Sequence, residues 1–401
     1  MPWRVSTDVS IREEFVLMAS AEEANIRRLC SRFGISPTTG YKWLRRWVES
    51  GCKKDALEEL PRTPKHSPNR TAAEIEQLVI NLREEHPAWG GRKLRARLLA
   101  KGQKPQRLPS ASTITSILRR RGLLSLEESE KREHYLSFEH PRPNDLWQID
   151  YKGDIPLEQA GVRCHPLTVL DDHSRFALGL VACANERSET TKEALTGIFR
   201  RYGLPFRTTM DNGSPWGHIS NSSGSNCDAG EARYTSLELW LFRLGIRVSH
   251  SRPYHPQTQG KDERFHRTLK LELLRDYSWR DVLECQPSFD RWREVYNCER
   301  PHEALGMAVP ASRYQPSGRP FPERLPELEY DAGEEVRKVN ARGMVKYKKS
   351  QYFLGHEFKG EYVALRPQQQ ADGVWDIYYG QQKVATLNFN KVSTMSPNTC
   401  P

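Results

Sequence analysis

Residues 146–154 read Leu-Trp-Gln-Ile-Asp-Tyr-Lys-Gly-Asp, and this stretch decides how the middle of the chain is interpreted. Apolar side chains surround Asp150, with Ile149 before it and Tyr151 after it, as in a buried strand. A carboxylate in such a strand costs several kcal/mol of desolvation unless a cation or hydrogen bonds compensate it. Asp150 is therefore either an aspartate hydrogen-bonded at a strand end or part of a functional site.

The length and composition of the chain set the first limits. Its 401 residues exceed one ordinary core, so roughly two to four domains are expected. The sequence has no apolar run near the ~20 residues that a membrane helix needs, and its first residues lack the apolar segment of a signal peptide. Eight cysteines without a Cys-x-x-Cys pair argue against a disulfide framework and a structural zinc site. We expect a soluble, intracellular protein.

The positive charge is concentrated near the N-terminus. Residues 1–140 hold 26 basic and 18 acidic residues, so +8 of the formal net charge of +10 lies there. Small helical segments with such an excess most often bind a polyanion, and nucleic acid is the commonest one. The alternative is a solvated basic surface.

Residues 1–60 are predicted to form a helix-turn-helix domain. One helix spans 22–33, Gly34 breaks it, and Ser36 caps a second helix that runs to about Val48. Tyr41, Leu44 and Val48 are expected to face inward, whereas Gly40 costs roughly 1 kcal/mol in a helix interior. Residues that would meet a major groove are Thr38, Thr39, Lys42, Arg45 and Arg46. A plain helical hairpin is the alternative.

Residues 70–124 are predicted to form a second helix-turn-helix domain. Thr71 to Glu74 has the pattern of a capping box, and a helix with Ile75, Leu78, Val79 and Leu82 follows. A basic helix around residues 92–97 and another that ends in Arg119 and Arg120 complete the unit, and these two arginines are candidate DNA contacts. Residues 125–145 are predicted to be a linker.

Beyond the linker the pattern becomes mixed α/β. Strands are expected at the stretch around Asp150, at 162–170 and at 176–182, followed by a helix at 188–202 and a strand at 206–210 that ends in Asp211. This order resembles a ribonuclease-H-like sheet, in which the fourth strand pairs with the first. The resemblance implies that Asp150 and Asp211 lie on neighbouring strands.

A third carboxylate comes from a helix that begins near Lys261. Phe265, Leu269 and Leu273 supply its inner face, whereas Glu263, Arg267 and Lys270 share another face at i, i+4 and i+7. Such a face suits a site that holds metal beside phosphate, with the acid pointing at the sheet. Its neighbour Asp262 is the less favoured alternative to Glu263. Asp171 and Asp172 are interpreted as turn formers that hydrogen-bond their own backbone.

Five successive motifs carry a resemblance to a known family. They are Trp147-Gln-Ile-Asp150, Asp171-Asp-His-Ser-Arg175, Asp211-Asn-Gly213, His255-Pro-Gln257 with Gly260-Lys-Asp-Glu-Arg-Phe265, and Tyr296-Asn297 with Arg300-Pro-His302. Together they resemble the retroviral-integrase-type core of bacterial insertion-sequence transposases, most closely the IS481 and IS3 groups. The 51 residues between Asp211 and Glu263 exceed the family's usual spacing, and the excess is predicted to be a surface insertion at 216–233.

The resemblance implies a DDE transposase with the catalytic and metal-binding triad Asp150, Asp211 and Glu263. Two Mg²⁺ ions about 4 Å apart, replaceable by Mn²⁺, would serve both the entering and the leaving oxygen of a phosphodiester. Asp150 is assigned to bridge them. Water would first free a 3′-hydroxyl at the element's end, and that hydroxyl would then attack target DNA. Candidate contacts to the DNA end are Lys261, Arg267 and Lys270.

The expected partners are the terminal inverted repeats of the element, the target DNA and further copies of the chain, as a dimer or tetramer in the bacterial cytoplasm at the nucleoid. The competing hypothesis is a catalytically inactive DNA-binding regulator derived from a transposase. Residues 330–395 contain short β-patterned runs separated by turns, as in an SH3-like β-barrel. The predicted architecture is thus multidomain α+β: helix-turn-helix domains, a ribonuclease-H-like α/β core at 146–308 and a small C-terminal β-barrel.

Overall fold

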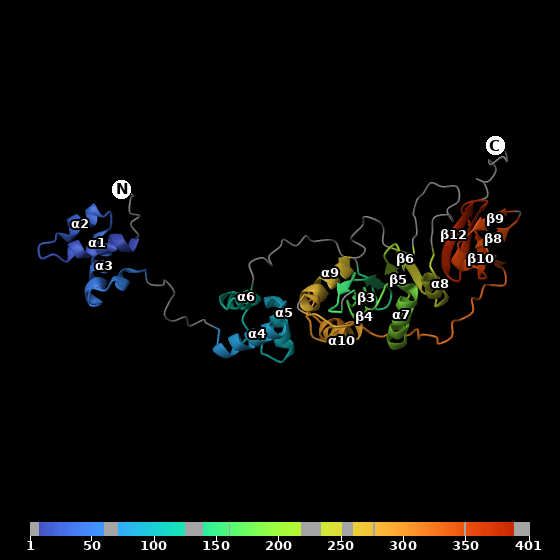
Figure 1. Ribbon diagram of the computed structural model, residues 1–401, viewed down its shortest axis with the longest axis horizontal. Coiled ribbons are helices and arrows are strands. Elements are labelled where there is room, and N and C mark those ends of the chain that lie inside the picture. Colours follow the sequence, from blue (N-terminus) through green and yellow to red (C-terminus); the bar gives the residue numbers. More distant parts are fainter. Residues whose placement is uncertain are drawn as a thin grey trace, which may run out of the picture. The chain divides into compact units, whose positions relative to one another are not determined.

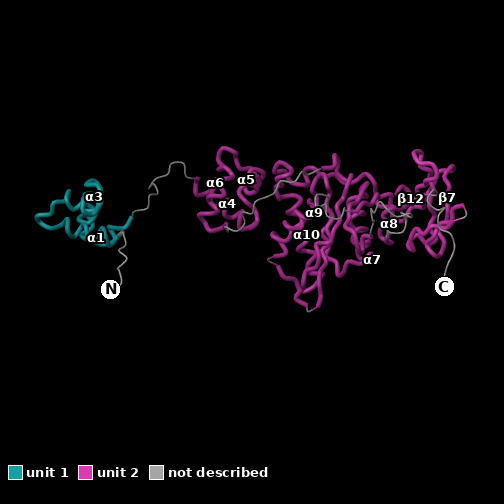
Figure 2. The backbone as a smooth tube through the Cα atoms, turned by 90° about the horizontal axis from the view of Figure 1, so that it is seen from above, with its two compact units in different colours: residues 1–70 teal, residues 71–401 magenta. Residues whose placement is uncertain are grey.

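A computed structural model describes residues 8–59, 71–124, 139–159, 161–217, 234–250, 260–275, 277–348 and 350–388. The chain divides into two compact units, residues 1–70 and 71–401 (Figure 2). Within the described ranges, no helix has both the length and the apolar character needed to span a membrane. Most of the predicted linker, most of the predicted insertion at 216–233 and the His255-Pro-Gln257 motif lie outside the described residues.

The first unit is a helical domain of the predicted helix-turn-helix class. Its elements are α1 (Asp8–Ala19), α2 (Ile26–Arg32), α3 (Pro37–Glu49) and the 3-10 helix η1 (Lys54–Leu57). Ser36 caps α3 as expected, because its hydroxyl accepts the backbone N–H of Thr39 at 3.2 Å. The sequence analysis missed α1, whose Phe15 and Val16 lie in the core with Cys30.

The inward face of α3 differs from the predicted one. Trp43 and Trp47 are buried, whereas Tyr41 and Val48 are 48% and 63% exposed. Gly40 is also buried, and a Cβ there would stand 2.4 Å from the Cys30 sulfur. Glycine therefore lets α3 approach its neighbours closely, and the two large indoles define the buried stripe.

Three helices form the second helical domain: α4 (Ala73–Glu85), α5 (Gly91–Ala100) and α6 (Ala111–Arg120). They pack around Trp89, with Val79 and Leu94 among the buried neighbours. Ser110 caps α6 by accepting the N–H of Thr113 at 3.2 Å. The predicted capping box is wrong, because α4 begins after Ala72 and has no side-chain cap.

The core sheet has the predicted ribonuclease-H-like arrangement. Its strands are β1 (Trp147–Tyr151), β2 (Ile155–Pro156), β3 (Arg163–Asp171), β4 (Ala177–Cys183), β5 (Arg207–Met210) and β6 (Arg247–His250). The order is β2-β3-β1-β5-β6, with β4 also paired to β3. β1 pairs antiparallel with β3 and parallel with β5, so the expected adjacency of the first and fourth predicted strands is confirmed.

Helices cover both faces of this sheet. On one side α7 (Ser188–Tyr202) and α8 (Ser236–Arg243) bury Phe199 and Trp240 against Trp147. On the other side are α9 (Gly260–Leu269), the π-helix η4 (Lys270–Leu274) and α10 (Val282–Cys298), which bury Phe265 and Phe289. Figure 1 shows the strands between these two groups of helices. The predicted inner face of α9 is confirmed, because Phe265, Leu269 and Leu273 are all buried.

The described C-terminal region contains six strands, β7 (Glu335–Lys338), β8 (Met344–Tyr347), β9 (Ser350–Phe353), β10 (Tyr362–Pro367), β11 (Val374–Tyr379) and β12 (Gln382–Asn388), and the 3-10 helix η7 (His356–Phe358). The 3-10 helices η5 (Glu303–Leu305) and η6 (Pro310–Ser312) follow α10 and precede these strands. The strands form one four-stranded and one two-stranded antiparallel sheet around a shared core. The Tyr234 hydroxyl donates to the Val384 carbonyl at 2.8 Å, so these sheets pack beside α8.

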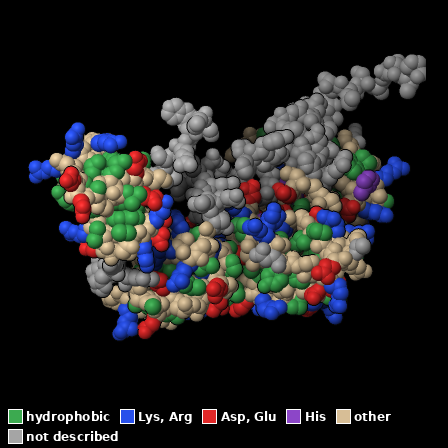
Figure 3. All heavy atoms as spheres, turned by 60° about the vertical axis from the view of Figure 1, so that its left-hand side comes forward, with side chains coloured by type: hydrophobic (Ala, Val, Ile, Leu, Met, Phe, Trp, Pro, Cys, Tyr) green, Lys and Arg blue, Asp and Glu red, His purple; other side chains and the backbone are tan. Residues whose placement is uncertain are grey.

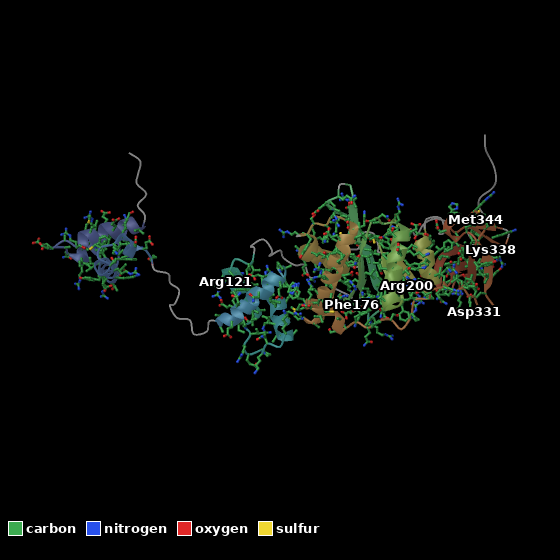
Figure 4. The ribbon with its side chains drawn as sticks, turned by 60° about the horizontal axis from the view of Figure 1, so that its bottom comes forward. Arg121, Phe176, Arg200, Asp331, Lys338 and Met344 are labelled. Carbon is green, nitrogen blue, oxygen red and sulfur yellow. The ribbon has the colours of Figure 1, made fainter. Side chains whose placement is uncertain are left out.

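The segment between core and C-terminal sheets runs along the core. The Tyr314 ring stacks on Phe176 with centroids 4.3 Å apart, and Arg200 donates to both carboxylate oxygens of Glu323 at 2.9 and 2.7 Å. Figure 4 marks Phe176 and Arg200 on the core and Lys338 and Met344 on the C-terminal strands.

Candidate active site

Asp150 and Asp211 lie at the ends of two neighbouring strands. In the parallel ladder Gln148 stands beside Thr209, and continuing that register by two residues brings Asp150 level with Asp211. Burial, together with the negative charge of Asp211, raises the pKa of Asp150 to about 7. The sheet therefore brings two of the three predicted acids near each other, and their negative charges repel.

The imidazole nearest Asp150 does not neutralise it. The His266 Nδ1 lies 3.8 Å from an oxygen of Asp150, and its Nε2 lies 2.8 Å from the Thr168 hydroxyl. Burial lowers the pKa of His266 to about 4, so the ring is neutral at pH 7. His266 therefore supplies no positive charge to Asp150.

α9 presents two adjacent acids on different faces. Glu263 is exposed, as are Arg267 and Lys270, which share its face as predicted. Asp262 instead lies on the inner face with Phe265 and is 1% exposed. The acid that points toward the sheet is thus Asp262, whereas Glu263 borders solvent. The spacing of 262, 265, 266 and 269 was the helical signal for this burial.

The Asp171-Asp172 pair has a structural role. Asp171 accepts the Ser174 N–H at 2.8 Å and the Ser174 hydroxyl at 2.5 Å, so the prediction of a turn former is confirmed for it. Asp172 is fully buried and accepts from the Gln148 amide at 2.8 Å, the His140 N–H at 2.9 Å and the Lys261 ammonium. Lys261, a predicted DNA contact, therefore ties the start of α9 to the turn after β3.

A buried acid and histidine support the backbone at Asp211. His250 places Nδ1 2.8 Å from the Asp211 carbonyl and Nε2 2.9 Å from a carboxylate oxygen of Glu238. Burial disfavours the protonated form of His250, but the hydrogen bond and the negative charge of Glu238 outweigh burial and raise the pKa of His250. Glu238 also completes a capping box with Thr235 at the start of α8. The sequence analysis missed this pair, because no local pattern links residues 238 and 250.

The predicted DNA-facing side chains of α3 and α6 are mostly exposed. Thr38, Lys42 and Arg45 are exposed on α3. The Lys42 ammonium and the Arg46 guanidinium lie 4.9 and 5.0 Å from the centroid of the Trp43 ring, and the Thr39 hydroxyl lies 2.9 Å from that of Ser36. Arg119 is exposed on α6, and Arg120 donates to Glu76 at 3.0 Å. Figure 3 shows lysine and arginine side chains interspersed with acidic ones on the face drawn.

The donor chemistry of this site fits a divalent cation that prefers oxygen. Asp150 and Asp211 repel each other, and neither oxygen of the buried Asp262 has a hydrogen-bond partner within the described part of the chain. Among the described residues, no three acidic, histidine or cysteine groups stand close enough together to hold an ion.

Comparison with protein families first identifies the class. The integrase core domain matches residues 140–256, and a second model of the same description matches 244–310. Homeodomain-like domains match residues 6–54 and 39–118. The chain thus carries an integrase core preceded by homeodomain-like domains. More particularly, residues 334–394 match the C-terminal domain of IS481 family transposases, and the predicted resemblance to the insertion-sequence transposases is confirmed.

Relatives at low identity agree with this assignment. The chain is 24% identical over 169 residues to the insertion element IS407 uncharacterized 31.7 kDa protein of Burkholderia multivorans, covering 42% of this chain and 54% of that protein. It is 22% identical to the insertion element IS476 uncharacterized 39.2 kDa protein of Xanthomonas euvesicatoria, covering 65% of this chain and 69% of that protein. The chain therefore spans about half to two thirds of these relatives.

Solved structures with a similar chain include viral integrases. An intasome of simian T-cell lymphotropic virus with a PP2A regulatory subunit has a TM-score of 0.35 at 14% identity, covering 77% of this chain and 98% of that chain. The HTLV-2 integrase catalytic core domain in complex with magnesium has a TM-score of 0.31 at 14% identity, covering 44% and 99%. No conclusion about the chemistry of this chain rests on these likenesses.

Proposed function

We propose that this chain is a DNA transposase that binds the terminal inverted repeats of an insertion sequence, nicks their ends by metal-dependent hydrolysis and joins the 3′-hydroxyls to target DNA. The observation that carries the proposal is that Asp150, on β1, and Asp211, directly after the neighbouring parallel strand β5, lie near enough for the charge of Asp211 to act on Asp150. An integrase core and an IS481-type C-terminal domain in one chain support the same reading.

Asp150, Asp211 and Glu263 are the groups proposed to hold Mg²⁺. When bound there, the metal would neutralise charge on the phosphodiester oxygens and make a bound water more acidic. Asp150 lies on β1, Asp211 directly follows the neighbouring strand β5, and Glu263 is exposed on α9. The tie between Lys261 and Asp172 holds the start of the helix that carries Glu263.

The DNA contacts follow from exposure. Arg267 and Lys270 lie on the face of α9 that carries Glu263 and are proposed to bind phosphates at the DNA end. Lys261, whose ammonium is held by Asp172, is proposed to anchor α9 rather than to reach a phosphate. On α3, the base-reading residues are proposed to be Thr38, Lys42 and Arg45, which are exposed.

Two element ends must be cut and joined in concert, so a dimer or tetramer on DNA is proposed, at the nucleoid of a bacterial cytoplasm. The proposed domain limits are 1–60 and 70–124 for DNA recognition, 146–308 for catalysis and 330–395 for the C-terminal sheets.

A joining assay tests the proposal directly. The full chain is incubated with Mg²⁺, a supercoiled plasmid and labelled duplexes taken from the DNA that flanks its gene, and junctions are read by sequencing. We expect 3′-ends of the duplex joined to plasmid DNA by the wild-type protein and no junctions from Asp150→Asn. Because Asp154 pairs with Arg163 on the surface, Asp154→Asn is the matched control and should join normally.

The same assay separates the two hypotheses. An Asp150→Asn protein that binds the flanking duplex as tightly as wild type, yet makes no junctions, supports catalysis by this site. Duplex binding without junctions from either protein, across flanks that contain the element ends, would favour the inactive regulator instead.

A further inference from the structure

Asp262 is a buried acid that the proposed triad does not use. It lies on the inner face of α9 with an exposed fraction of 1%, and neither carboxylate oxygen has a hydrogen-bond partner among the described residues. An isolated buried charge costs many kcal/mol, and even a neutral buried carboxyl without partners is unfavourable. A position one turn before Phe265 and His266 would ordinarily hold an apolar residue.

The surroundings of Asp262 add further negative charge. The carboxylates of Asp150, Asp172 and Asp211 all act on it electrostatically. The nearest cation, Lys261, opposes this only weakly because Asp172 already takes up its ammonium. His266 is neutral. The described residues therefore leave Asp262 among like charges with little compensation.

The backbone of α9 explains how two consecutive acids can serve one site. Successive residues of a helix point about 100° apart, so Asp262 faces the sheet while Glu263 faces solvent. α9 packs beside Asp150, because its His266 Nδ1 lies 3.8 Å from a carboxylate oxygen of Asp150, and the charges of Asp150 and Asp211 both act on Asp262. A cation bound between the sheet and α9 would thus have the carboxylates of Asp150, from the sheet, and of Asp262, from the helix, as possible ligands.

We propose that Asp262 is a fourth carboxylate of the cation site, binding a hard divalent ion from the sheet side together with Asp150 and Asp211. This inference rests on the proposed function and assigns one further ligand to its site. Glu263 keeps its place on the solvent side, where the DNA phosphate would approach. The ligand class is a divalent ion with oxygen preference, Mg²⁺ or Mn²⁺, because every donor is a carboxylate.

Two properties of an Asp262→Asn variant test the proposal on the full chain without DNA. Calorimetric titration with Mn²⁺ should show binding at least about 10-fold weaker than wild type, since a ligand has lost its charge. Thermal unfolding in EDTA should show a higher Tm than wild type, because a charge repelled by its neighbours has been removed. A weaker ion site in a more stable protein is a combination that a purely structural aspartate would not produce.

Comparison variants keep the outcomes distinct. Asp262→Val suits the apolar face and should repeat both effects if the amide variant folds poorly. If the Asp262 variants bind Mn²⁺ as tightly as wild type and Asp150→Asn does not bind it, Asp262 is not a ligand, and the proposed function stands. Unchanged Mn²⁺ binding in Asp150→Asn as well would overturn the proposed function with it.

Discussion

Two groups of acidic residues lie within the core domain, and they differ in whether the protein supplies hydrogen bonds and positive charges to them. Asp172 receives three donors, and Glu238 is matched by His250 and by the start of α8. Asp150 stands beside another acid and a neutral imidazole, and Asp262 has no partner for either oxygen within the described residues. The protein itself compensates Asp172 and Glu238, whereas Asp150 and Asp262 are proposed to be compensated by a bound cation.

The compensated groups also hold the segments that carry the proposed site residues. Lys261 and Asp172 hold the start of α9, and His250 holds the carbonyl of Asp211. The first pair thus fixes the segment that carries Asp262, and the second fixes the backbone of Asp211. Four predictions test this division.

The largest effect is expected on catalysis from Asp211→Asn. Because the amide keeps the shape but loses the charge, joining of the flanking duplex should fall by about 1000-fold or more. Binding of that duplex, measured by fluorescence anisotropy, should stay within about twofold of wild type. A variant that still joins within tenfold of wild type would remove Asp211 from the site.

The largest effect on stability is expected from Asp172→Ala. It leaves Lys261, the Gln148 amide and the His140 N–H without their acceptor, so the free energy of unfolding should fall by about 4 to 5 kcal/mol. Asp154→Ala breaks only the exposed pair with Arg163 and should cost less than about 1 kcal/mol. Urea unfolding measures both, and equal losses would erase the distinction between buried and surface charges.

Removal of the charge at Asp150 should stabilise the metal-free protein. The pKa of Asp150 rises from 3.8 to about 7 in the fold, so folding favours its protonated form. In EDTA, wild type should therefore lose roughly 3 kcal/mol relative to Asp150→Asn as pH rises from 4 to 7, and no more above 7. Urea unfolding at several pH values gives this difference, and a constant difference across the range would contradict it.

A smaller pH effect is expected at His250, where the loss of a stabilising positive charge, not the gain of a negative one, lowers stability as pH rises. Its pKa is raised in the fold, so its stabilising charge is fully present below pH 6.5 and is lost as pH rises through the folded value. The advantage of wild type over His250→Gln should be about 1 to 2 kcal/mol at pH 6 and should shrink as pH rises. An advantage that grows with pH would show that the ring is buried neutral.

The topology of the core was predictable because local patterns specify it. The helix expected at 188–202 coincides with α7, and the strand expected at 206–210 differs from β5 by one residue. Asp150 and Asp211 could be paired from the fold alone, since the first and fourth predicted strands are neighbours in this sheet. Their common level along the ladder became visible only in the register.

Other features depend on tertiary contacts that one sequence does not reveal. The role of Gly40 follows from the closeness of Cys30 and Phe15, which lie on two other helices. Asp172 looks like its neighbour Asp171 in the sequence, yet it binds groups from three distant segments. The spacing along α9 predicts the burial of Asp262, whereas the resemblance to the family motif favours Glu263 as the site residue.

The central claim is that a divalent cation binds Asp150 on β1 together with Asp211, which directly follows β5. The most direct measurement is the Tm of the full chain at pH 7.5 in EDTA and in 10 mM Mg²⁺ at constant ionic strength, for wild type and Asp150→Asn. We predict that Mg²⁺ raises the Tm of wild type by several degrees and leaves Asp150→Asn unchanged. An equal response of the two proteins, or no response in wild type, would contradict the claim.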